Sequence, residues 1–253
     1  MADTAEQAGL PRGELGAFAL SLASHLFSPY ELNPAGIAPL RELLEELVDF
    51  ERLRRARPFK LLIAATNLRT GKGRVFQEHE LTVECVLASA ALPQLHRSVE
   101  IAGELYWDGG YTSNPPVVAL AERSRVRDIV IVRINPVESE AVPKSASAIR
   151  NRTAEIVFGH PLQVELERLQ HARDLARGPA GWLSPALRRL ARVQVDTISC
   201  DETLGRLDPS TRVLPQWPVL EQLRDAGRDA AEGFLARAMR PYARPDLDAA
   251  PPT

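Results

Sequence analysis

The residues best suited to chemistry lie in the run Tyr106-Trp107-Asp108-Gly109-Gly110-Tyr111. This run follows a strand-like stretch and places one carboxylate, Asp108, on a glycine turn, where hydrolases hold a general base. Gly109 and Gly110 allow a substrate or a second loop to come close to the backbone. The aromatic residues of the run are expected to shield the carboxylate from water, which raises its pKa and strengthens it as a base.

A nucleophile to accompany this base is missing from the sequence. The chain contains no Gly-x-Ser-x-Gly, the elbow that presents a serine nucleophile in many esterases. Ser89 lies inside a helical pattern without flanking glycines, so packing or capping is the expected role. Ser113 is too close to Asp108 in sequence to be its evident partner. The sequence therefore predicts a general base but no nucleophile.

Neither a metal site nor a nucleotide cofactor is expected. The histidines, which are His25, His79, His96, His160 and His171, show no ligand spacing such as His-x-x-x-His, so surface or core roles are predicted for them. Cys85 and Cys200 are too far apart in sequence to form a zinc pattern or a disulfide framework, which fits a reducing cytoplasm. No glycine-rich phosphate-binding motif occurs, so no cofactor is predicted.

The composition is that of an ordinary globular protein. Of 253 residues, 45% are hydrophobic and 25% charged, and the net charge is −2, which argues against nucleic acid as a partner. The N-terminus lacks the basic start and apolar centre of a signal peptide. No run approaches the roughly 20 apolar residues that span a bilayer. We therefore expect a cytoplasmic protein whose membrane contact, if any, is peripheral.

Strands and helices alternate along the chain, which indicates the α/β class. Strands are predicted near residues 59–66, 74–76, 98–107 (two strands), 128–136 and 193–199, and helices near 13–27, 40–47, 82–91, 146–157, 162–176 and 218–238. The dense apolar runs 59–66 and 128–136 favour strands buried on both faces, as in a parallel sheet. Turns are expected at 28–34, where two prolines oppose a helix, and at 70–73. We predict one domain over 1–240 and a loose tail over 241–253.

Several motifs together resemble the bacterial patatin-like phospholipase family. They are Ser28-Pro29-Tyr30-Glu31-Leu32-Asn33-Pro34, Leu62-Ile63-Ala64-Ala65-Thr66-Asn67, Leu87-Ala88-Ser89-Ala90-Ala91-Leu92-Pro93, Tyr106-Trp107-Asp108-Gly109-Gly110-Tyr111, Ile131-Val132-Arg133-Ile134-Asn135-Pro136 and the helical stretch from Trp217 to Leu235. Their order and spacing agree with the family over most of residues 20–240. The Asp-Gly-Gly block is the most specific of them.

The resemblance implies an α/β/α sandwich with a mainly parallel central sheet, and hydrolysis of acyl esters such as phospholipids by a Ser-Asp dyad. Asp108 matches the dyad aspartate, and Gly109 and Gly110 complete its motif. In the family, a glycine-rich oxyanion loop and the serine elbow precede the region matched here. We therefore expect an incomplete sandwich that is inactive as written, because the oxyanion hole and the nucleophile supply most of the rate enhancement.

Three interpretations follow from the sequence. The first is a patatin-type acyl hydrolase whose nucleophile-bearing part is absent from this chain. The second is a non-catalytic relative that binds lipid or another protein. The third is an unrelated α/β protein in which Asp108 and its glycines form only a turn, since Asp-Gly is a common hairpin sequence.

Overall fold

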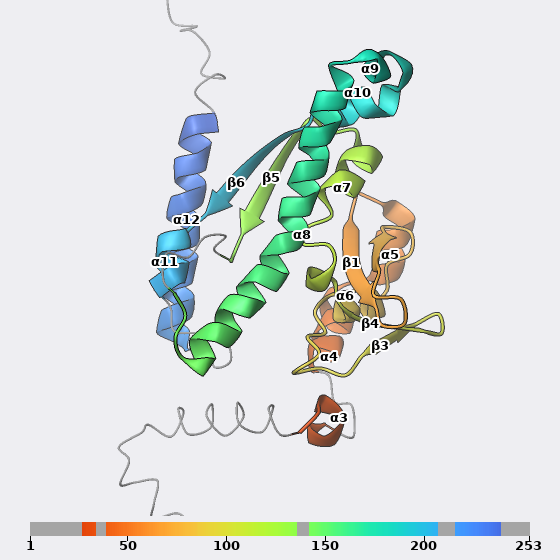
Figure 1. Ribbon diagram of the computed structural model, residues 1–253. Coiled ribbons are helices and arrows are strands. Elements are labelled where there is room, and N and C mark those ends of the chain that lie inside the picture. Colours follow the sequence, from red (N-terminus) through yellow and green to blue (C-terminus); the bar gives the residue numbers. More distant parts are fainter. Residues whose placement is uncertain (1–26, 34–38, 136–141, 207–215, 239–253) are drawn as a thin grey trace, which may run out of the picture. The chain divides into compact units, whose positions relative to one another are not determined.

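The computed structural model describes residues 27–33, 39–135, 142–206 and 216–238, which divide into two compact units (Figure 1). Unit 1 comprises Met1–Ile129 and Val137–Gln194, and unit 2 comprises Val130–Pro136 and Val195–Thr253. Helices and strands alternate along the chain, which confirms the α/β class. The predicted helix over 13–27 lies outside the described residues except for Phe27, and so does the predicted tail over 241–253. The single domain over 1–240 stays a prediction.

Unit 1 contains an antiparallel sheet. Its strands are β1 (Leu62–Asn67), β2 (Gly73–Gln77), β3 (Val99–Ile101) and β4 (Glu104–Asp108), in the order β2-β1-β4-β3. Each neighbouring pair is antiparallel. The predicted mainly parallel sheet is therefore not confirmed. Short connections explain the difference: Ala102 and Gly103, both with positive φ, join β3 to β4, and a turn through Gly71 joins β1 to β2. Parallel strands need much longer crossovers.

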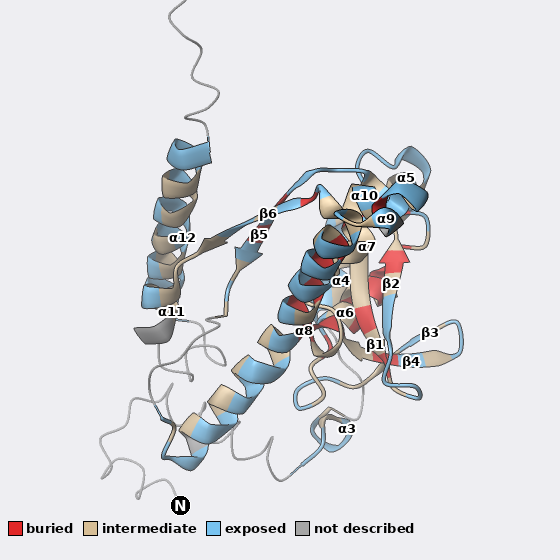
Figure 2. Ribbon diagram, turned by 45° about the horizontal axis from the view of Figure 1, so that its top comes forward, coloured by how far each residue is buried: buried red, intermediate tan, exposed pale blue. Residues whose placement is uncertain are grey.

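Helices cover this sheet from the same unit. α6 (Val83–Ser89) packs on β1, β3 and β4, α5 (Phe50–Ala56) packs against the same core, and α4 (Pro39–Leu47) packs on α6. The main core cluster lies between α6 and the sheet and consists of Ala65, Phe76, Leu81, Cys85, Ala88 and Tyr106, with Leu53 of α5 packed against it (Figure 2). The rings of Phe76 and Tyr106 meet edge to face, with 5.6 Å between their centroids. This core fixes β4, the strand that ends in Asp108.

Two local predictions near the N-terminal side need correction. The segment 28–34 was predicted as a turn, but Pro29–Leu32 form one helical turn, α3, closed by a capping box between Ser28 and Glu31. A proline is tolerated there because it occupies the first helical position, whose N–H needs no partner in the helix. The second prediction is that Thr82 caps the helix over 82–91. Thr82 is the N-cap of α6, but its side chain makes no capping hydrogen bond.

A second group of helices in unit 1 is formed by α7 (Val117–Ser124), α8 (Ala146–Ala176), α9 (Pro179–Leu183) and α10 (Pro185–Ala191). Two helices, 146–157 and 162–176, were predicted where the structure has the single helix α8. Pro161 lies inside it and is buried. A proline costs a helix about 3 kcal/mol. The packing of α8 against α7, α9 and α10 outweighs that cost.

The remaining strands pair with each other. They are β5 (Asp128–Arg133) and β6 (Gln194–Ser199), which form a two-stranded sheet and run in the same direction in Figure 1. Burial alternates along β5, with Ile129 and Ile131 buried and Val130 and Val132 exposed, so the prediction that this strand is buried on both faces is wrong. The described part of unit 2 also holds α11 (Asp201–Arg206) and α12 (Trp217–Ala238).

Candidate active site

Asp108 lies at the end of β4, where the strand turns into the short 3-10 helix η1 (Gly109–Tyr111). It is the N-cap of that helix, and its Oδ1 accepts a hydrogen bond from the Gly110 N–H at 2.7 Å. Among the described residues, no hydrogen-bond partner is recorded for the other carboxylate oxygen, Oδ2. One oxygen is thus held by the turn, and the other is available to accept a proton.

The two glycines of the motif are required by close packing. A Cβ on Gly109 would overlap the carbonyl group of Ala64 on β1, and a Cβ on Gly110 would overlap the ring of Phe158 on α8. Neither glycine has a positive φ, so the need is for space and not for an unusual backbone conformation. The elements that come close to the glycines are the strand β1 and the helix α8, whereas the sequence predicted a substrate or a second loop.

Hydroxyl groups tie the turn to the neighbouring strand. Thr66 Oγ1 on β1 donates to the Asp108 carbonyl oxygen at 2.8 Å and lies 2.9 Å from Thr112 Oγ1. The Asp108 N–H donates to the Ala91 carbonyl at 3.0 Å, just beyond α6. Backbone contacts on both sides therefore position the Asp108 carboxylate.

Burial raises the pKa of Asp108 above the ordinary value for aspartate, because half-burial disfavours the charged form. The Gly110 N–H and the positive charge of His96 oppose this shift and lower the pKa. The net direction is upward, as a general base working near neutral pH requires.

His96 is the residue near Asp108 that sequence reasoning missed, since all five histidines were given surface or core roles. It is exposed, and its charge acts on the Asp108 carboxylate. The segment after α6 brings it there, through the hydrogen bond from Asp108 N–H to Ala91. Nothing in the spacing of His96 and Asp108 signals this proximity, because it depends on how α6 packs against β4.

The aromatic residues of the motif surround the carboxylate less directly than predicted. Tyr106 is buried in the core against Phe76, and Tyr111 packs on Phe158 with 4.9 Å between ring centroids. Successive strand residues alternate faces, so Trp107 projects from the opposite face of β4 to Asp108. Trp107 therefore does not lie on the face of β4 from which Asp108 projects.

Neither of the two serines considered in the sequence, Ser89 and Ser113, has a recorded hydrogen bond to the Asp108 carboxylate in the described part of the chain. Ser89 is the last residue of α6 and is half-buried. Ser113 Oγ lies against Gly73 of β2, where an added Cβ would be 3.0 Å away. Within the described residues no group of three or more His, Cys, Asp or Glu side chains is arranged to hold a metal ion.

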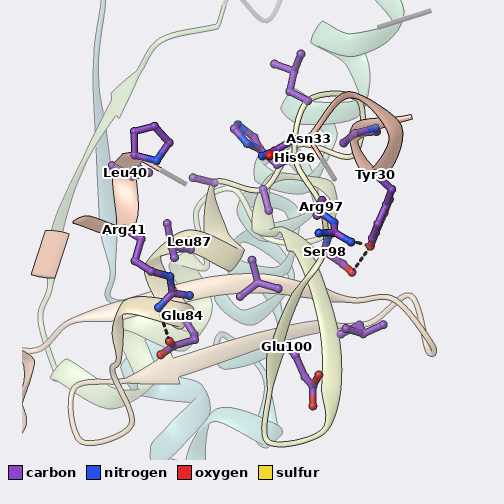
Figure 3. Close-up of a pocket in the computed structure, with 17 residues that line it drawn as sticks. Tyr30, Asn33, Leu40, Arg41, Glu84, Leu87, His96, Arg97, Ser98 and Glu100 are labelled. Atoms are coloured by element: carbon purple, nitrogen blue, oxygen red, sulfur yellow. Dashed lines mark hydrogen bonds and ion pairs between the residues drawn. The ribbon is translucent and has the colours of Figure 1, made fainter. Parts of the chain in front are cut away.

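A cavity of about 750 Å³ lies beside this site (Figure 3). Its lining is partly apolar and includes Leu40, Leu87, Ala90, Ala91, Leu95, Val99 and Leu105. A hydrogen bond between Tyr30 and Ser98 and an ion pair between Arg41 and Glu84 cross its walls. Ala91 and His96 belong both to this lining and to the surroundings of Asp108. The cavity therefore adjoins the carboxylate.

Comparison with known proteins gives one family. Residues 19–121, which include α3 to α6, the whole antiparallel sheet and Asp108, match the model described as patatin-like phospholipase. No curated protein matches the chain. The family match argues against the interpretation of an unrelated α/β protein. Over residues 19–121 the chain is therefore similar to the patatin-like phospholipases, as its motifs predicted.

Proposed function

We propose that unit 1 supplies the general base of a lipid acyl hydrolase of the patatin type, and that this base is Asp108. The observation that carries the proposal is a half-buried carboxylate with a raised pKa, held on a packed glycine turn in the region of the family match, with one oxygen that has no recorded partner among the described residues. The antiparallel sheet would be the part of a layered α/β/α sandwich that carries this turn.

The chemistry follows from the carboxylate. Asp108 Oδ2 would take the proton of a serine hydroxyl as that oxygen attacks the acyl carbonyl of a phospholipid or another acyl ester. The protonated Asp108 would give this proton to the leaving alcohol oxygen as its bond to the acyl carbon breaks. The carboxylate would then take a proton from the water that attacks the acyl-serine ester, and return it to the serine oxygen as the free acid leaves. Thr66 and Gly110 keep the carboxylate in place during both steps. The serine is not supplied by this chain, so we infer that the 253-residue polypeptide alone does not hydrolyse esters.

The experiment has two arms. The chain alone is tested with p-nitrophenyl esters, with phospholipid vesicles and with a fluorophosphonate probe, and neither turnover nor labelling is expected. The chain is then mixed with a separate segment of a patatin-like phospholipase that carries the oxyanion loop and the Gly-x-Ser-x-Gly elbow. Hydrolysis should appear, and Asp108→Asn should reduce it at least a hundredfold. Asp229→Asn, at an exposed aspartate of α12 that lines neither cavity, is the matched control. Equal activity of Asp108→Asn and wild type would remove Asp108 from the mechanism.

The cavity favours a second candidate function, a non-catalytic lipid-binding role. Its apolar lining suits an acyl chain, as ligand sites are mostly apolar with a few polar groups. A fluorescent fatty acid should then bind the chain alone, and Leu95→Asp in the lining should weaken binding about tenfold. Leu47→Asp, at an exposed leucine of α4 that does not line the cavity, is the control. Binding unaffected by Leu95→Asp would contradict this role.

A further inference from the structure

An exposed apolar tip projects where α8 is connected to α10. Trp182 and Leu183 of α9 are 86% and 85% exposed, and Leu175 near the end of α8 is 58% exposed. We call these three residues the α9 tip; the helix α9 is labelled in Figures 1 and 2. Such side chains cost free energy when they stay in water. A group of them at one place marks a surface that meets another apolar phase.

The α9 tip is held in a fixed place by the backbone beneath it. Gly181 is buried so closely against α8 that a Cβ would overlap the Ala176 carbonyl group. The Gly181 N–H donates to the Gly178 carbonyl, and the Ser184 side chain caps α10 by accepting from the Leu187 N–H. Trp182 and Leu183 therefore project from a short, anchored helical turn.

Positive charge surrounds the α9 tip. Residues 175–195 contain four arginines, Arg177, Arg188, Arg189 and Arg192, and no aspartate or glutamate. Arg177 pairs with Asp174 on its own helix. Arg188 and Arg192 are exposed, and no ion pair to another described residue is recorded for either. The whole chain is slightly acidic, so this positive segment is a local feature.

A polar cavity extends the positive region on the side of Arg192. It measures about 590 Å³ and is lined by Arg127, Arg173 and Arg192 together with Asp128 and the Ala191, Val193 and Gln194 positions. Arg173 is partly engaged, since its Nη2 donates to the Val193 carbonyl at 2.6 Å. Guanidinium groups bind phosphate oxygens well, so a lipid phosphate is a suitable occupant of this cavity.

From these observations we propose that the α9 tip and its flanking arginines form a docking site for an anionic lipid surface. Tryptophan and leucine would enter the boundary between head groups and acyl chains, and the arginines would bind lipid phosphates. Charge complementarity selects a lipid surface over an apolar protein partner, because the apolar residues are few and Arg188 and Arg192 beside them have no recorded ion pair with a described residue. The inference deepens the proposed function, since it names the phase in which an acyl-ester substrate would be met, but its test needs no enzymatic activity.

The experiment is vesicle co-sedimentation of the whole chain. Vesicles of equal parts phosphatidylcholine and phosphatidylglycerol are compared with vesicles of phosphatidylcholine alone. Binding is expected to the anionic vesicles and should fall as salt is raised, because charges near a surface are screened over about 10 Å at 0.1 M salt. Preference for neutral vesicles, or no binding to either, would overturn the proposal.

Variants separate the two parts of the site. Trp182→Ala with Leu183→Ala should weaken binding at least tenfold, and Trp217→Ala, at a 69% exposed tryptophan of α12, should leave it unchanged. Arg188→Gln with Arg192→Gln should weaken binding to anionic vesicles, by about fivefold for each arginine. Arg55→Gln on α5, another exposed arginine, is its control. Equal effects of site and control variants would contradict the assignment.

Two further measurements distinguish a lipid surface from a second copy of the chain at the α9 tip, and vesicle binding from hydrolysis. Light scattering gives the molar mass of the chain without vesicles. A mass that falls in the Trp182→Ala, Leu183→Ala variant would show that a second copy of the chain covers the tip, and would overturn the lipid proposal. Asp108→Asn should bind vesicles as wild type does. The vesicle-binding proposal and the hydrolase proposal can therefore fail independently of each other.

Discussion

At the scale of single residues, the turn that carries Asp108 requires a residue without a Cβ at position 109. Gly109 lies where β4 turns into η1, and a methyl group there would overlap the Ala64 carbonyl of the neighbouring strand. Gly109→Ala should therefore lower the free energy of unfolding by about 2–4 kcal/mol, in the range of overpacking and backbone displacement. Urea unfolding followed by circular dichroism measures this. Gly159→Ala on α8, where an added Cβ meets nothing within 4 Å, should be neutral or stabilising. Similar losses in both variants would show that Gly109 is not specially constrained.

The raised pKa of Asp108 also has a consequence for stability. Burial, the main cause, means that the folded state favours the protonated carboxyl more than the unfolded state does. This stabilising contribution is complete below the ordinary pKa of aspartate and is lost as pH rises through the raised pKa of the folded state. Asp108→Asn resembles the protonated group, so it should raise the free energy of unfolding at neutral pH by roughly 0.5–1 kcal/mol. The difference from wild type should vanish in acid.

A direct test of the same electrostatics uses the second residue of the site. The positive charge of His96 lowers the pKa of Asp108, so His96→Gln should raise that pKa further. Carboxyl-carbon NMR titration of Asp108 measures the change. His79→Gln, at an exposed histidine, is the matched control and should leave the Asp108 pKa unchanged. A fall in the pKa of Asp108 in His96→Gln would contradict the assigned interaction.

At the scale of elements, α8 supports the helix that follows the site. The first residues of α7 have no side-chain cap of their own, since Pro116 is the N-cap. Glu165 on α8 is buried and accepts a hydrogen bond from the Val118 N–H at 2.7 Å, and Arg168 lies 2.9 Å from its other oxygen. A carboxylate at a helix N-terminus satisfies a free N–H and interacts favourably with the helix dipole.

Loss of that carboxylate should be costly. Glu165→Ala is expected to lower the free energy of unfolding by about 2–3 kcal/mol, because it removes a charge-assisted hydrogen bond and leaves the half-buried Val118 N–H unsatisfied. Chemical denaturation gives the value. Glu167→Ala, at an exposed position of the same helix, should change the stability by less than about 0.5 kcal/mol. Equal stability of Glu165→Ala and Glu167→Ala would show that α7 does not depend on this contact.

The elements also show what can be predicted from the sequence and what cannot. Local signals located β1, β4 and the Asp-Gly-Gly turn, because an apolar run, a short turn and glycines act within a few residues. The dense apolar run 59–66 was misleading for strand pairing, because it favoured a parallel sheet. Hairpin turns set the antiparallel direction of β2 against β1 and of β3 against β4. Pro161 was misleading for α8, where packing outweighs the local penalty. His96 could not be found, because its place beside Asp108 arises only from the packing of α6.

At the scale of the whole molecule, the proposed hydrolase takes its general base from this chain and its serine from a second segment. In that mixture the pH dependence of kcat/KM should report on Asp108, because only the deprotonated carboxylate can take the serine proton. Rate should fall as pH decreases through the pKa of Asp108. Burial raises that pKa, so the fall should begin at higher pH than for an exposed aspartate. His96→Gln should move the acid limb of the profile to still higher pH, and His79→Gln should not move it.

Lipid vesicles as substrate should give the same acid limb as a water-soluble ester, since the α9 tip affects where the substrate is met and not how the proton is transferred. An acid limb that differs between the two substrates, or one that His96→Gln leaves in place, would show that a group other than Asp108 limits the reaction.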